Sequence, residues 1–134
     1  MIVVGPGSLY TSLLPNLLVQ DLLGAIHASR AVKVYICNIV TQAGETDAFT
    51  CYDHIRALET HVGDNLFDVL LCNDNFSKQP NEDDQWVEID DKTRSDTRTK
   101  YADLINEANP WRHDSNKLAN ALIEILDEYT GPLE

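Results

Sequence analysis

The sequence predicts an α/β protein with a Rossmann-like three-layer fold and a mainly parallel sheet. Three short runs of β-branched and other apolar residues alternate with two segments in which apolar residues recur at helical spacing. The short runs are apolar on both faces, which is typical of parallel strands buried between layers of helices. With 134 residues, 43% of them hydrophobic, the chain is long enough for one domain with its own core.

The first half of the chain is expected to run strand, helix, strand. The first strand covers residues 2–4 and stops at the turn Gly5-Pro6-Gly7. Pro15 suits the first turn of a helix that continues to about Ser29. The second strand, residues 32–37, follows after a short turn, so parallel pairing with a helical crossover is expected.

The second helix and third strand have clear local signals. Thr50 is a predicted helix cap with Asp53 at the third helical position, and Gly63 ends the helix. The third strand is expected at residues 66–72. Asp53 and His54 lie in the first turn of this helix, where the helix dipole favours a carboxylate and disfavours a charged histidine. His54 is therefore either a neutral imidazole at the edge of a site or merely an exposed residue.

The remainder of the chain is predicted from weaker patterns. Residues 73–85 are polar and are expected to form a mobile loop, with a short strand at 86–89. Apolar residues at 101, 104 and 105 suggest a short helix. The last helix is expected to begin at Asp114 or Ser115 and to stop at Gly131-Pro132.

The charge balance argues against several classes of function. Ten basic against 22 acidic side chains give a net charge of −12, which repels nucleic acid and anionic membranes. Neither a spanning apolar run nor an export signal is visible, so a cytoplasmic protein is expected, with no membrane partner. The three widely spaced cysteines are expected to be reduced and structural, with Cys37 and Cys72 buried at strand ends, and no metal site is expected.

Polar residues follow each predicted strand, at the edge where parallel sheets bind ligands. The turn around Gly5 and Gly7 has backbone amides at Gly7, Ser8 and Leu9 that suit a phosphate, although a plain turn is the alternative. The Thr11 hydroxyl lies in the same segment.

Other candidate residues come from later segments. Asn38 and Asn16 are candidates for hydrogen bonds to a sugar or base, and Thr46 with Asp47 forms either part of a site or a solvated turn. Arg112 precedes the last helix with no local capping role and is a candidate for closing over an anion.

Four blocks of the chain resemble, in order and in register, the family of YvcK-like gluconeogenesis factors and CofD-like 2-phospho-L-lactate transferases (UPF0052-type). The blocks include GPGSLYTS at 5–12, VYICN at 34–38 together with GETD at 44–47, Asp53-His54 with Ala57-Leu58, and RHD at 112–114. The resemblance implies that residues 1–134 are the carboxyl-terminal portion of a single CofD/YvcK-like domain. The amino-terminal half of that domain, with the metal-binding aspartates of the transferase branch, is expected to be missing.

The resemblance implies a nucleotide-sugar (UDP-sugar type) binding regulatory protein of carbon metabolism and of cell-wall and cell-shape processes. The alternative is a 2-phospho-L-lactate transferase that acts on a deazaflavin acceptor with magnesium. A non-catalytic interaction module is the third hypothesis. The chain alone is expected to be inactive as a transferase and to form a homo-oligomer. Magnesium is expected only in a full-length, transferase-like parent, and no cofactor is expected in this chain.

No catalytic residue is assigned. The predicted binding set for a phosphate-containing small molecule consists of Gly5, Gly7, Ser8, Leu9, Thr11, Asn16, Asn38, Thr46, Asp47 and Arg112.

Overall fold

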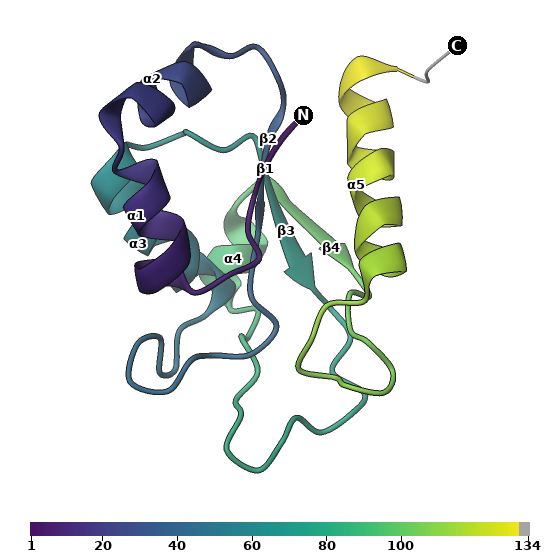
Figure 1. The fold of residues 1–134 in the computed structure, drawn as a ribbon. Coiled ribbons are helices and arrows are strands. Elements are labelled where there is room, and N and C mark those ends of the chain that lie inside the picture. The colour runs from purple at the N-terminus through teal and green to yellow at the C-terminus, as the bar shows by residue number, and fades with distance from the viewer. Residues whose placement is uncertain (132–134) are drawn as a thin grey trace.

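A single parallel sheet organises the chain in the computed structural model, which describes residues 1–131 (Figure 1). Every neighbouring pair of strands is parallel, and the strands lie in sequence order across the sheet. This confirms the predicted α/β fold. The strands are β1 (Ile2–Val4), β2 (Lys33–Ile36), β3 (Val69–Asn73) and β4 (Thr99–Ala102).

Helices cover both faces of the sheet, as Figure 1 shows. On one side lie α1 (Leu14–Leu17), α2 (Gln20–Ala28) and α3 (Cys51–Val62). On the other side lies α5 (Ser115–Thr130). A π-helical turn, η1 (Leu9–Leu13), leads into α1, and a short α4 (Asp91–Ser95) precedes β4.

Two apolar cores follow from the alternation of side chains along β2. Tyr35 points to the side of α1–α3 and packs with Leu58 and Phe67 in the first core. Its neighbours Val34 and Ile36 point the other way and join the core beneath α5. Because successive side chains of a strand face opposite sides, one buried strand serves both cores and fixes the three layers.

Capping residues set the ends of the two long helices. Thr50 and Asp53 form a reciprocal capping box at the start of α3, and Gly63 ends that helix with φ 94°. Asp114 caps α5 by accepting from two backbone amides, and Gly131 follows its last residue. These predicted boundaries are confirmed. Pro132, the other half of the predicted stop, lies outside the described residues.

The predicted helix from residue 15 to residue 29 is wrong as a single element. Helical structure begins earlier, at Leu9, and breaks where Val19 adopts an extended backbone, so the two parts are bent by 74°. The break leaves Leu18 and Leu22 about half exposed rather than on a buried face. Within residues 1–131 no single helix has the length and apolarity to cross a membrane, although the two parts of this bent pair reach that length and apolarity together.

The predictions for residues 86–105 also need correction. The expected helix near Tyr101 is the strand β4, because pairing with β3 overrides a weak local pattern. The expected strand at 86–89 is reduced to one antiparallel bridge between Val40 and Trp86. The third strand begins at Val69 rather than at residue 66.

A buried ion network ties α3 to the segment that precedes β4. Arg98 Nη1 lies 2.6 Å from Glu59 Oε1, and Arg98 Nη2 lies 2.7 Å from Asp96 Oδ2. Arg56 reaches the second Glu59 oxygen at 3.1 Å. Because the Glu59 carboxylate is almost fully buried, these guanidinium groups compensate a charge that would otherwise destabilise the fold.

Candidate functional site

The loops that follow the strands gather at the carboxyl edge of the sheet, at the lower end of Figure 1. A cavity of about 400 Å³ opens there between the loops that follow all four strands, and the loop after β3 contributes the acidic Asp84. This is the edge at which parallel α/β sheets bind ligands. Its lining includes Gly7, Asn38, Thr41, Gln42, Trp111 and His113.

Asn38 joins the first loop to the second. Its Nδ2 donates to the Gly7 carbonyl at 3.1 Å, and its Oδ1 accepts from the Gly7 amide at 3.3 Å. The predicted role of Asn38 at a site is therefore compatible with its position. The Gly7 amide, however, is committed to Asn38 and is not free for a phosphate as the sequence pattern suggested.

Ser8 makes the second connection between these loops. Its hydroxyl donates to Glu45 Oε2 at 3.0 Å, contacts the Thr11 hydroxyl and accepts from the Thr11 amide, so it caps η1. Leu9 is 1% exposed and belongs to the core, so its backbone amide is enclosed together with its side chain. The first amides of a helix have no acceptor within the helix, and the exposed Tyr10 therefore starts this helical stretch with an open donor.

Gly5 and Gly7 are explained by packing. A Cβ at Gly5, where φ is +91°, would lie 2.8 Å from the Ile36 carbonyl oxygen. A Cβ at Gly7 would lie 3.2 Å from Leu13 Cδ2. A branched residue at either position would therefore disturb the turn itself, and it is not a clean probe of ligand binding.

Three further predicted site residues lie away from the cavity lining. Thr46 is buried, and its hydroxyl accepts from the Gln42 amide at 2.8 Å. The exposed Asp47 accepts from the Gly44 amide at 2.8 Å, so both side chains shape their own loop. Asn16 lies in a different, mainly apolar cavity of about 580 Å³ beside β1.

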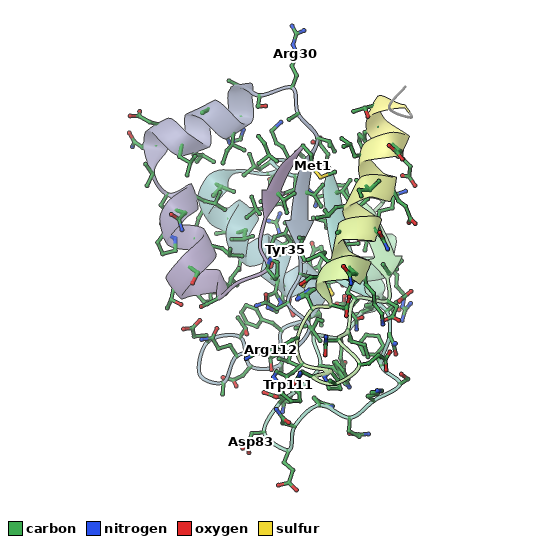
Figure 2. All side chains as sticks on the ribbon, turned by 45° about the vertical axis from the view of Figure 1, so that its right-hand side comes forward. Met1, Arg30, Tyr35, Asp83, Trp111 and Arg112 are labelled. Atoms are coloured by element: carbon green, nitrogen blue, oxygen red, sulfur yellow. The ribbon has the colours of Figure 1, made fainter. Side chains whose placement is uncertain are left out.

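The loop before α5 brings residues that the predicted set omitted. His113 Nε2 donates to the Cys37 carbonyl at 3.2 Å, which places the ring proton on Nε2 and leaves Nδ1 as an acceptor. Burial lowers the pKa of His113, so the neutral ring is favoured. Trp111 lines the cavity, and Figure 2 shows Arg112 beside it at the loop end of the molecule. The RHD block drew attention to this loop, whereas nothing in the sequence singled out Trp111.

The Arg112 side chain is exposed and forms no ion pair with the described residues. Arg112 does not line the cavity, and its role in closing over an anion stays a prediction.

The residues present do not fit magnesium, which prefers a set of oxygen ligands. Glu45 and Asp47 accept hydrogen bonds from Ser8 and Gly44 rather than converging with a third carboxylate. Within residues 1–131, the one group of three His, Cys, Asp or Glu side chains with converging ligand atoms consists of cysteines. No step of the proposals below passes through magnesium.

Comparison with known proteins identifies strong similarities across the whole described chain. A family model described as 2-phospho-L-lactate transferase CofD matches residues 1–130. The gluconeogenesis factor of Listeria monocytogenes is 42% identical over 140 aligned residues, which cover 100% of this chain and 44% of that protein. The gluconeogenesis factor of Bacillus subtilis is 37% identical and covers 96% of this chain and 43% of its own length.

A solved structure shows the same fold. The crystal structure of a UPF0052 family protein from Bacillus halodurans superposes with a TM-score of 0.80 at 37% sequence identity. The match covers 91% of this chain and 42% of that chain. The present chain therefore spans less than half the length of the relatives that it matches.

Proposed function

The chain belongs to the CofD family, and on that premise we propose that it contributes a binding site for a phosphate-containing small molecule, with a nucleotide sugar of the UDP type as the favoured ligand. The relatives are named gluconeogenesis factors, which supports a regulatory role in carbon metabolism. A role in cell-wall and cell-shape processes and a cytoplasmic location belong to the same proposal.

The observation that carries this proposal is the cavity between the loops that follow β1 and β2. It combines the flat indole of Trp111 with amide and hydroxyl groups from Asn38, Thr41 and Gln42. Ligand sites typically pair an apolar or aromatic surface with a few fixed polar groups. A base can stack on the indole while the amides hydrogen-bond the base or the sugar.

The phosphate groups are placed next to this cavity, at the amino end of the helical stretch that begins at Leu9. The open amide of Tyr10 supplies a donor there, and the hydroxyls of Ser8 and Thr11 become donors to the ligand when it displaces the Glu45 carboxylate that accepts from Ser8. A helix amino terminus carries about half a positive charge, so an acidic protein can bind an anion there without a basic patch. Arg112 would add one charged donor from the opposite loop.

A CofD-like transferase is the second candidate, and the description of the matching family model favours it. In this hypothesis the same cavity would hold part of a guanylyl donor or a deazaflavin acceptor. Binding of a single nucleotide does not decide between the two candidates, because both involve a nucleotide-like ligand, so several ligands must be compared.

A thermal-shift panel tests the proposal. UDP-sugars, a guanylyl donor and a deazaflavin are each added to the chain and to a longer protein that contains it, and the unfolding temperature is measured. Stabilisation by UDP-sugars above the other ligands supports the nucleotide-sugar site. Stabilisation by the guanylyl donor and deazaflavin alone would favour the transferase, and no shift with any ligand would favour a non-catalytic interaction module.

A further inference from the structure

The fold brings three cysteines that are far apart in the sequence into one cluster. Cys37 directly follows β2, Cys72 lies in β3, and Cys51 is the first residue of α3. Their three sulfur atoms all lie within 4.8 Å of one another. The predicted burial of Cys37 and Cys72 is confirmed. The expectation of well-separated thiols is wrong, because parallel pairing sets β2 and β3 in register and the first residue of α3 packs against the same part of the sheet.

This thiol cluster, defined as Cys37, Cys51 and Cys72, is enclosed by protein. Each of the three residues is at most 4% exposed. Free cysteines in a core usually behave as small apolar residues, and one of them would need no explanation. Three thiols that converge from separate elements do need an explanation, and so do two unpartnered polar atoms on the same elements.

Two such polar atoms lie on the elements that carry the cluster. The Tyr35 hydroxyl and His54 Nε2 are both buried without a hydrogen-bond partner. Tyr35 precedes Cys37 by two residues on the same face of the strand, and His54 follows Cys51 by three residues along α3. Buried polar atoms are paired in the great majority of cases, so two unpartnered atoms on the elements that carry the thiol cluster point to a missing ligand.

The tautomer of His54 leaves its lone pair available on the unpartnered nitrogen. Nδ1 lies 2.9 Å from the Thr50 carbonyl oxygen, which can only accept, so Nδ1 carries the proton. His54 is fully buried, which excludes the exposed alternative weighed from the sequence. A metal-binding histidine typically donates its second ring N–H to a backbone carbonyl in this way.

The electrostatics also suit a thiolate. Cys51 lies in the first turn of α3, where the helix dipole stabilises negative charge.

We propose that the thiol cluster is a binding site for a thiophilic divalent cation of the zinc class, with His54 Nε2 as the fourth ligand. Three thiolates and one neutral imidazole match a tetrahedral Cys₃His zinc site and leave a net charge of −1. The Tyr35 hydroxyl can then donate to a bound thiolate. The three sulfur atoms alone form the close group in this structure, so the proposal requires His54 Nε2 to approach them when the ion binds.

Cobalt(II) titration of the reduced chain tests this assignment, since cobalt(II) reports tetrahedral thiolate ligation by its visible and charge-transfer absorption. We expect saturation at one ion per chain and displacement by zinc. Cys72→Ser abolishes the charge-transfer bands, while His54→Ala retains thiolate bands, changes the visible bands and weakens binding by about tenfold or more. His61→Ala, at an exposed histidine of the same helix, is the control and is expected to bind normally.

The fold of each variant is checked by circular dichroism, and zinc-induced thermal stabilisation gives a second readout for the unmodified chain. Absence of thiolate bands and of zinc stabilisation in the folded, reduced chain would overturn the proposal. Binding of copper(I) without binding of cobalt(II) or zinc would overturn the assignment to a zinc-class ion. Unchanged spectra and affinity in His54→Ala would show that His54 is not the fourth ligand.

Discussion

Asn38 holds the backbone of Gly7 from both sides, by donating to its carbonyl and accepting from its amide, although the two residues are 31 positions apart. The pair fixes the distance between the loops that follow β1 and β2. Those loops form two walls of the cavity that we propose as the ligand site. Asn38 therefore links the stability of the sheet edge to the shape of the site.

Asn38→Ala is expected to destabilise the fold by about 1–3 kcal/mol, because it removes two partly buried hydrogen bonds. Urea unfolding followed by circular dichroism measures the difference. Asn16→Ala is the matched control, since Asn16 is exposed and bonds only the Ser12 carbonyl one turn earlier. Equal destabilisation by the two substitutions would contradict the bridging role of Asn38.

The ion network around Arg98 predicts a defined acid sensitivity. The Arg98 guanidinium holds the pKa of Asp96 below its ordinary value. A carboxyl group with a depressed folded-state pKa stabilises the fold above its unfolded pKa of about 4, and this contribution is lost as the pH falls through the folded-state pKa. We expect Asp96→Asn to be less stable than the unmodified chain at neutral pH, with a difference that shrinks below about pH 4.

Asp83→Asn is the control for this experiment, because Figure 2 shows Asp83 at the tip of an exposed loop. Its stability is expected to follow the unmodified chain at every pH. A stability difference for Asp96→Asn that stays constant from neutral pH to about pH 3 would argue against the network.

The edge strand β1 predicts self-association of the chain, in line with the expected homo-oligomer. Val3 is 41% exposed, and Leu22 at 43% borders the apolar cavity beside the same strand. Exposed strand edges and apolar surface favour contact between chains. Sedimentation velocity is expected to show a dimer or larger species at concentrations on the order of tens of micromolar, and Leu22→Lys is expected to weaken it.

Ile123→Lys gives a matched control for association, since Ile123 is 56% exposed on α5, on the opposite face of the sheet. It should leave the sedimentation profile unchanged. A monomer at all concentrations in the unmodified chain would refute the predicted association.

We also predict that this chain alone has no transferase turnover. Catalysis needs its reacting groups held in one preorganised site, and residues 1–131 present no converging set of oxygen ligands for magnesium. The measurement is transfer of the 2-phospho-lactyl group from a guanylyl donor to a deazaflavin in the presence of magnesium. Product formed by the purified chain would show that the site is more complete than proposed.

Local signals were sufficient to predict several elements. The caps at Thr50 and Asp114 and the apolar spacing that follows them define α3 and α5. The strand β4 could not be predicted in this way, because Thr-Lys-Tyr-Ala has little apolar pattern and is held by pairing with β3. Tertiary pairing, rather than propensity, decides such an edge strand.

Some residues of the candidate site could also be predicted from local sequence, and others could not. Asn38 was predictable because it directly follows a strand, at the edge where ligands bind. Trp111 and His113 reach the cavity because the chain crosses from β4 to α5 on the other face of the sheet, which no local pattern specifies. The thiol cluster was missed for the same reason, since its members are distant in sequence and meet only when β2, β3 and α3 pack together.

Isothermal titration with a UDP-sugar tests the central claim most directly, using a longer protein that contains this chain and its variants. We expect Trp111→Ala and Arg112→Ala to weaken binding, the latter by about 1.5–3 kcal/mol if its hydrogen bond is charge-assisted, while Asn16→Ala binds normally. Unchanged affinity in both the Trp111 and the Arg112 variant, with native circular dichroism, would contradict a ligand site at the carboxyl ends of β1 and β2.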